Sequence, residues 1–176
     1  MELPSTASGQ FHGAWLGNKA IYRMRMAMAD GGELLVLAPG VRRFGEDGAI
    51  DALIRKFGYR GKPAVLRAVR ENEDLTASLS AAAHLIHGSS EGRFRITYGP
   101  GGLCKEEIRA VGFEYAPLAR MIERYNPATL QEGYNHLDGE DVYFVPNPAS
   151  GLRAVRQALL PAGLPRSARI CEPALH

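Results

Sequence analysis

Cysteine is scarce in this chain of 176 residues, which contains two. Cys104 and Cys171 lie far apart, and neither belongs to a Cys-x-x-Cys pair. Neither a zinc site of that kind nor a disulfide framework is therefore indicated. Such cysteine usage fits a reducing compartment, and we expect a cytoplasmic protein.

Long hydrophobic runs are also lacking. No apolar stretch reaches the roughly 18 residues that a membrane-spanning helix requires. Residues 1–5 do not show the basic segment followed by an apolar segment that marks a secretory signal. We therefore expect a soluble protein that is not exported and has no membrane partner.

A strong excess of one charge is the third missing feature. The 21 lysines and arginines nearly balance the 19 aspartates and glutamates, which gives a formal net charge of +2. Basic residues recur at helix-surface spacing, with acidic residues between most of the groups. A charge this small and this mixed argues against a nucleic-acid partner.

What the chain does contain is typical of one globular domain. Hydrophobic residues make up 45% and charged residues 23% of the sequence, a balance that supports a packed core. The length leaves little room for two domains. We expect a flexible arm or linker remnant at 1–13, a single domain at 14–160 and a loose tail at 161–176.

Strand patterns alternate with helix patterns along the domain. Residues 33–38 are continuously apolar, which predicts a strand covered on both faces, whereas residues 93–98 alternate and predict one buried face. The expected elements are helices at 18–28, 50–57, 63–69, 75–87, 105–110, 116–125 and 150–160, strands at 33–38, 93–98 and 141–145, and an edge strand at 111–115. This order predicts the α/β class: a layered domain with a small, mainly parallel sheet of three or four strands, flanked by helices.

Two glycine-rich stretches are candidates for nucleotide-binding loops. Gly31 and Gly32 precede a strand, whereas a dinucleotide-binding fingerprint follows a strand and opens a helix, so the fingerprint is excluded. Residues 99–102 do follow a strand, and their amides could meet an anion at a helix N-terminus. They lack the Lys-Ser/Thr of a P-loop, so phosphate binding there is not favoured.

His84 and His87 have the spacing of two ligands to one metal on a helix face. No third ligand has suitable spacing, since Glu91 lies beyond the break at Gly88. We therefore favour a structural or supporting role for the pair over direct metal ligation.

Lys19 and Arg42 are the cations best placed to bind an anionic ligand. Lys19 stands at the opening of the helix expected at 18–28, where a cation opposes the helix dipole and suits a ligand anion better. Arg42 follows the strand at 33–38. Ligands of open α/β sheets bind beyond the carboxyl ends of the strands, where a guanidinium can grip a carboxylate. Exposed surface charge is the alternative for both residues.

Three segments together resemble one family. They are residues 18–41, which contain NKAIYR and ADGGELLVLAPGV, residues 84–94, which read HLIHGSSEGRF, and residues 145–148, which read VPNP. These segments resemble the C-terminal part of lactate racemase homologues, the nickel-pincer-nucleotide-dependent 2-hydroxyacid racemases and epimerases. The similarity extends over roughly residues 14–155.

The resemblance implies part of an isomerase that interconverts the two configurations at C2 of a small 2-hydroxyacid. In that family a nickel-pincer nucleotide takes up the C2 hydride and returns it, while two histidines exchange the hydroxyl proton. The cofactor and those histidines belong to the family's N-terminal catalytic domain, so His84 and His87 are not that pair. The resemblance thus implies that this chain binds no cofactor by itself, is inactive alone, and pairs with that domain in cis or in trans.

The family's C-terminal domain contributes an aromatic-Gln-x-x-Lys motif whose lysine helps to bind the substrate. The matching stretch here, residues 15–19, reads WLGNK. The resemblance therefore assigns substrate binding to Lys19 and Trp15, and it places no catalytic, cofactor-binding or metal-binding residue in this chain. Arg42 is a third candidate because of its position after a strand. Leu16 replaces the glutamine, which favours a hydroxyacid other than lactate, such as a sugar acid.

A second interpretation is a non-catalytic binding or assembly module with the same fold that docks onto a partner protein. An exposed apolar patch would accord with either interpretation, because such patches usually mark contact surfaces. A homodimer formed through the patch is also compatible with both.

Overall fold

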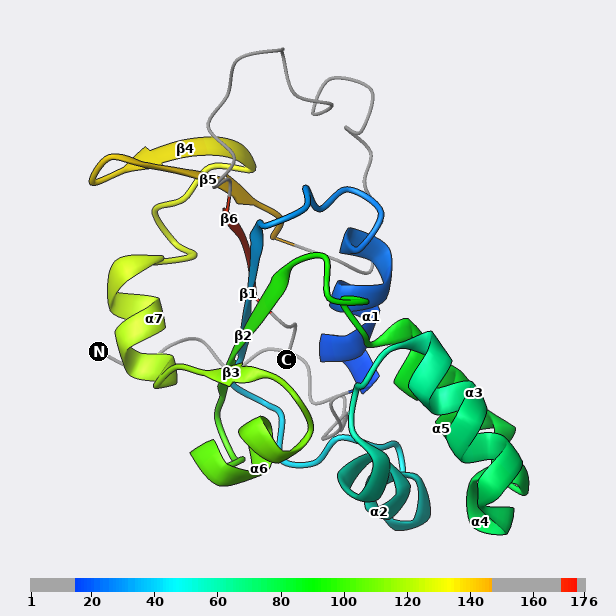
Figure 1. Ribbon diagram of the computed structural model, residues 1–176. Helices are drawn as coiled ribbons and strands as arrows, with labels where there is room; N and C mark the ends of the chain where they lie inside the picture. The colour runs from blue at the N-terminus through cyan, green and yellow to red at the C-terminus, as the bar shows by residue number, and fades with distance from the viewer. Residues whose placement is uncertain (1–14, 147–168, 174–176) are drawn as a thin grey trace.

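The computed structural model describes residues 15–146 and 169–173, with side chains described for residues 20–146. The arm expected at 1–13 and the helix expected at 150–160 lie outside the described residues. Figure 1 shows the arrangement of the elements. In chain order they are α1 (Trp15–Met24), β1 (Glu33–Ala38), α2 (Gly48–Phe57), α3 (Lys62–Glu71), α4 (Glu73–Thr76), α5 (Leu79–His87), β2 (Arg95–Pro100), α6 (Lys105–Ala110), β3 (Glu114–Tyr115), α7 (Leu118–Arg124), β4 (Gly133–Leu137), β5 (Glu140–Phe144) and β6 (Arg169–Pro173).

The strands form one six-stranded sheet in the order β3-β2-β1-β6-β5-β4. Every neighbouring pair is parallel except β4 and β5, which are antiparallel. The predicted α/β class, with a mainly parallel sheet flanked by helices, is therefore confirmed. The sheet is wider than the three or four strands expected.

The additional width comes largely from β4 and β6. β4 joins β5 through a tight turn in which Asp138 and Gly139 have φ values of 48° and 82°. An Asp-Gly pair is a hairpin signal, although the residues of β4, GYNHL, show no clear hydrophobic alternation of their own. β6 pairs with β1 and β5, although it lies in the segment expected to be a loose tail. The sequence did not predict this strand because its five residues, RICEP, are too few to show a hydrophobic pattern.

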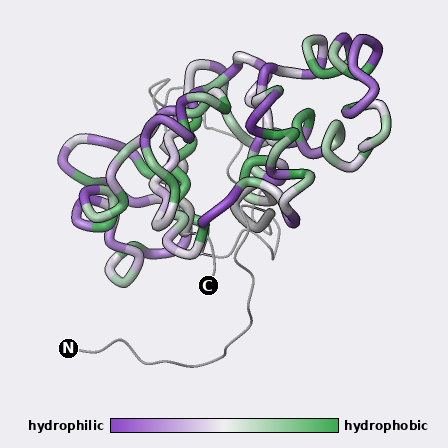
Figure 2. Tube along the Cα trace, turned by 90° about the horizontal axis from the view of Figure 1, so that it is seen from below, coloured by the Kyte–Doolittle hydropathy of each residue, from purple (hydrophilic) through white to green (hydrophobic). Residues whose placement is uncertain are grey.

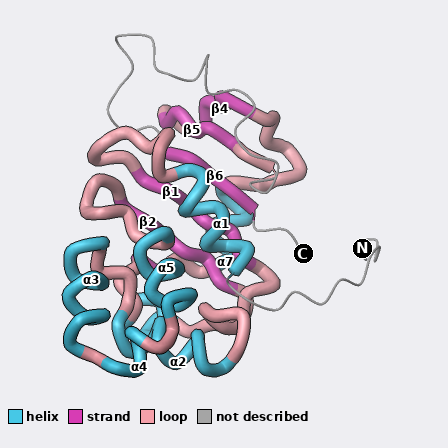
Figure 3. The backbone as a smooth tube through the Cα atoms, turned by 90° about the vertical axis from the view of Figure 1, so that its right-hand side faces the viewer, coloured by secondary structure: helices cyan, strands magenta, loops and turns pink. Residues whose placement is uncertain are grey.

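Helices cover both faces of the sheet. Figure 3 shows α1 to α5 gathered on one side of the strands, with α7 behind them. In β1, Leu34 and Val36 belong to the larger hydrophobic cluster, whereas Leu35 and Leu37 belong to the smaller one. The smaller cluster consists of Leu35, Leu37, Met121, Tyr125, Val142 and Phe144. Both faces of β1 are thus buried, which explains the continuous apolar run.

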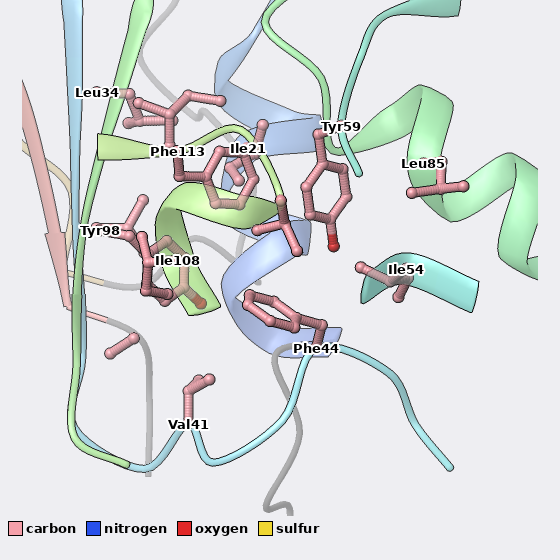
Figure 4. Close-up of a cluster of buried hydrophobic side chains, with 14 of the residues drawn as sticks. Ile21, Leu34, Val41, Phe44, Ile54, Tyr59, Leu85, Tyr98, Ile108 and Phe113 are labelled. Atoms are coloured by element: carbon pink, nitrogen blue, oxygen red, sulfur yellow. The ribbon is translucent and has the colours of Figure 1, made fainter. Parts of the chain in front are cut away.

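The centre of the larger cluster contains three aromatic rings. Figure 4 shows Tyr59, Phe113 and Tyr98 with the surrounding aliphatic side chains. The rings of Tyr59 and Phe113 are stacked with centroids 4.6 Å apart, and those of Phe113 and Tyr98 are 5.8 Å apart. Stacking joins the turn before α3, the turn after α6 and strand β2 into one core.

Strand β2 differs from the prediction of one exposed face. Only Arg95 is exposed, and Ile96, Thr97 and Tyr98 are all buried. The Thr97 hydroxyl donates a hydrogen bond to Glu33 Oε1 on β1 at 2.6 Å. The expectation was wrong because a polar side chain with a partner inside the sheet can occupy a covered face.

The single helix expected over 75–87 is divided into α4 and α5. The Thr76 hydroxyl donates to the carbonyl oxygens of Asn72, at 3.0 Å, and Val69. Such bonds between a side chain and the preceding backbone compete with helix continuation, and α5 begins after Ser78.

Within the part of the chain that the structure describes, no helix is both long and apolar enough to cross a membrane. Figure 2 shows hydrophilic and hydrophobic residues interleaved along the helices. This is the pattern of helices with one face in a core.

Candidate functional site

Helix α1 carries two of the three predicted substrate-binding residues, Trp15 and Lys19. They lie in its first half, and their side chains lie outside what the structure describes. The helix is fixed by Ala20, Ile21 and Met24, which are at most 1% exposed. Because α1 runs opposite to β1, its first turn lies at the sheet edge where β1 and β2 end (Figure 1).

Arg42, the third predicted residue, is exposed in the loop that follows β1. β1 lies inside the sheet, between β2 and β6, and both neighbours are parallel to it. Ligands of open α/β sheets bind beyond the carboxyl ends of the strands. The structure therefore brings Arg42 and the first turn of α1 to the same edge of the sheet.

The loops after β1 and β2 are in tight contact at this edge. The Gly101 N–H donates to the Ala38 carbonyl oxygen and the Gly102 N–H to that of Val41, both at 2.9 Å. A Cβ added to Gly101 would lie 1.9 Å from the Pro39 carbonyl oxygen. The amides considered for anion binding are thus occupied by backbone carbonyls, so a phosphate loop at 99–102 has no support.

His84 and His87 occupy different environments. His84 is 6% exposed, and its Nδ1 lies 3.3 Å from the Tyr59 hydroxyl. Burial, with a smaller effect from His87, lowers the pKa of His84 to about 4. The exposed His87 instead packs edge-on against Tyr22, with ring centroids 4.7 Å apart. No group of three or more His, Cys, Asp or Glu among the described residues could hold a metal ion.

Two of the segments that carry the family resemblance meet at Arg93. Its Nε donates to Asp30 Oδ1 at 2.7 Å, and its two terminal nitrogens donate to the carbonyl oxygens of Arg25 and Met28 at 3.1 and 2.7 Å. In return the Gly31 N–H donates to the Arg93 carbonyl oxygen at 2.6 Å. The segment 84–94 therefore holds the end of α1 in place.

Glu91 connects the same segment to α3. Its φ of 54° lies in the left-handed region, which residues other than glycine rarely adopt. Both carboxylate oxygens accept the Lys62 backbone N–H, at 3.0 and 3.1 Å, and the Ser89 hydroxyl accepts the Glu91 N–H at 3.1 Å. Gly61, the N-cap residue of α3, has no side chain that could cap the helix. The Glu91 carboxylate therefore accepts the hydrogen bond that an N-cap side chain would otherwise accept. This polar loop has an architectural role.

A cavity of about 560 Å³ that is widely open to solvent lies beside α1, where the turn after it meets the end of α5 and the start of α3. The lining residues are Tyr22, Arg23, Arg25, Met26, Lys62, Ile86 and His87. None of them was predicted to bind a ligand. Tyr22 and Arg23 belong to a segment of the resemblance and His87 was noted for its spacing, but Lys62 joins them through the fold, which no local pattern reveals.

No protein-family model and no curated protein matches this chain. A crystal structure of a Thermotoga maritima protein, a structural genomics target, is similar to it with a TM-score of 0.58 and 23% sequence identity. The similarity covers 80% of this chain and 34% of that longer chain. At this level of sequence identity the similarity supports the fold alone. This chain spans about 34% of the length of the Thermotoga maritima protein.

Proposed function

We propose that this chain is the substrate-side C-terminal domain of a nickel-dependent 2-hydroxyacid racemase or epimerase. The proposal starts from the resemblance to lactate racemase homologues. The observation that carries it is the contact of Arg93 with Asp30 and with the carbonyl oxygens at the end of α1. It supports the proposal because the two long segments of the resemblance form one unit around the helix on which Lys19 lies.

The predicted substrate-binding residues have defined tasks in this proposal. Lys19 pairs with the substrate carboxylate or an oxygen near it, and Trp15 shapes the pocket. Arg42, at the same edge of the sheet, offers a guanidinium that can bind a carboxylate through two parallel hydrogen bonds. With Leu16 in place of a glutamine, a hydroxyacid other than lactate, such as a sugar acid, is the preferred substrate.

In this proposal the nickel-pincer nucleotide and the groups that exchange the hydroxyl proton belong to the N-terminal catalytic domain, as the resemblance implies. Among the described residues, no group of three or more His, Cys, Asp or Glu side chains could hold a metal ion by itself. The contribution of this chain is to bind and orient the substrate in the cytoplasm.

A second candidate is a binding or assembly module that docks onto a partner or onto a second copy of the chain. It accords with the exposure of several large apolar side chains, because contact surfaces are built from such residues where they lie together. Met26 is 82%, Leu79 67% and Tyr22 50% exposed.

The experiment that separates the two candidates mixes the 176-residue chain with a cofactor-loaded N-terminal domain of the same enzyme. The two configurations of a panel of 2-hydroxyacids and sugar acids are then followed by chiral chromatography. We expect no turnover by the chain alone and turnover by the mixture. Stable association without turnover supports the docking module, and turnover by the chain alone contradicts the proposal.

A further inference from the structure

We propose that the cavity between α1, α3 and α5 is a binding site for a small organic anion with an apolar body, such as a ring that bears a phosphate or carboxylate group. Its volume of about 560 Å³ lies in the range of small-molecule sites. Arg23, Arg25 and Lys62 line it, and no acidic residue does so among those that the structure describes. The site is independent of the racemase proposal and stands or falls without it.

Arg23, Arg25 and Lys62 have no ion-pair partner among the described residues, whereas such partners are present for Arg55, Lys56, Arg93, Arg120 and Arg124. Like charges gathered around one cavity repel each other, and an anion between them removes that repulsion. The arrangement therefore favours a negatively charged ligand.

Lys62 gives the strongest indication. It is the first residue of α3, and the first turn of that helix contains no acidic residue. A cation at this end of a helix opposes the helix dipole. The carboxylate of Glu91 is engaged with the Lys62 backbone N–H. An external anion would compensate the side-chain charge that the fold places at an unfavourable position.

The walls of the cavity are held in place before any ligand arrives. Arg25 donates a hydrogen bond to the Ile86 carbonyl oxygen at 3.1 Å, which joins the turn after α1 to the end of α5. The His87 ring meets the Tyr22 ring at an interplanar angle of 71°. Fixed walls reduce the entropy lost on binding.

The remaining lining residues indicate the other half of the ligand. Tyr22 is 50% and Met26 82% exposed, and Ile86 lines the cavity and also packs against the core cluster. A flexible thioether and a phenol ring are good partners for a flat apolar group. A ligand with both an anion and an apolar body would cover these side chains and meet the cations at once.

The test is a titration of the full chain with phenyl phosphate, benzoate and inorganic phosphate, followed by NMR at Tyr22 and His87. We expect saturable binding of at least one ring-bearing anion, and the stronger of the two identifies the preferred acidic group. Arg23→Gln or Lys62→Gln should weaken that binding about three- to fivefold. Met26→Ala should weaken the binding of the ring-bearing anion but leave the response to inorganic phosphate unchanged.

Arg120→Gln is the matched control, because it removes an exposed cation from α7 on the opposite side of the sheet. An equal loss of affinity in this variant would mean diffuse charge attraction and would overturn the proposal. Absence of saturation, or equal binding of phenyl phosphate and inorganic phosphate, would also overturn it. All substituted side chains are exposed, so the variants are expected to fold, which an unchanged NMR fingerprint away from the cavity verifies.

Discussion

Arg93 contacts Asp30 through a hydrogen bond of 2.7 Å between residues 63 positions apart. The same guanidinium reaches the carbonyl oxygens of Arg25 and Met28. Helix ends leave carbonyl groups without partners inside the helix, and Arg93 supplies donors in this region. Its partners differ in environment: the Asp30 side chain is 79% exposed, whereas the hydrogen bond to the Met28 carbonyl oxygen is partly buried.

Removing the guanidinium should therefore cost more than removing the carboxylate. We predict that Arg93→Gln lowers the free energy of unfolding by about 1–3 kcal/mol, because hydrogen bonds to two carbonyl groups are lost. Asp30→Asn should cost less than about 1 kcal/mol, since exposed ion pairs contribute little. Urea denaturation of the two variants beside the wild type measures both. Equal losses would show that the ion pair, and not the carbonyl contacts, holds this end of α1.

His84 should make stability depend on pH. Burial lowers its pKa from 6.5 to about 4, so the folded state favours the neutral ring. The contribution of the neutral His84 ring to the free energy of unfolding is complete above pH 6.5. It is lost as the pH falls from 6.5 towards 4, by about 3 kcal/mol in total. Unfolding free energies measured across this range should fall less steeply for His84→Gln than for the wild type.

The difference between the wild type and His84→Gln across the range from pH 6.5 to about 4 isolates the effect of the buried imidazole. A His84→Gln variant with an unchanged slope would contradict the role given to the buried imidazole.

Gly101 should be intolerant of a side chain, because a Cβ there would overlap the Pro39 carbonyl oxygen. We predict that Gly101→Ala lowers stability by about 1–3 kcal/mol, the usual cost of overpacking, and displaces the loop that carries Arg42. Gly40→Ala is a matched control in the loop after β1 that carries Arg42, since a Cβ at Gly40 meets nothing within 4 Å. Thermal unfolding compares them, and similar melting temperatures would exclude the tight loop contact.

Local pattern was sufficient for several elements of the fold. The apolar run at 33–38 predicted β1 with its observed bounds, Glu33–Ala38. The helix expected at 105–110 also has the observed bounds of α6, Lys105–Ala110. β6 was not predicted because the strands that stabilise it, β1 and β5, are distant in sequence. The burial of Thr97 was not predicted because its hydrogen-bond partner, Glu33, lies on another strand. Short-range periodicity describes one segment and contains no information on its neighbours.

The candidate sites show the same division. Arg42 was placed at the carboxyl edge of the sheet by its position after a strand, and the structure has it there. The cavity at Lys62 was not foreseeable, because its walls come from three helices that only the folded chain brings together. Substrate binding by Lys19, Trp15 and Arg42 stays a prediction.

The central claim is tested most directly by racemisation with the assembled two-domain enzyme, comparing wild type, Lys19→Arg and Lys19→Ala. The account predicts turnover of a 2-hydroxyacid or sugar acid by the wild type. It predicts that Lys19→Ala loses about 30- to 100-fold in kcat/KM, because a charged hydrogen bond to the substrate is removed, and that Lys19→Arg retains part of it. Equal kcat/KM for wild type and Lys19→Ala, or no turnover of any hydroxyacid by the assembled enzyme, would contradict the account.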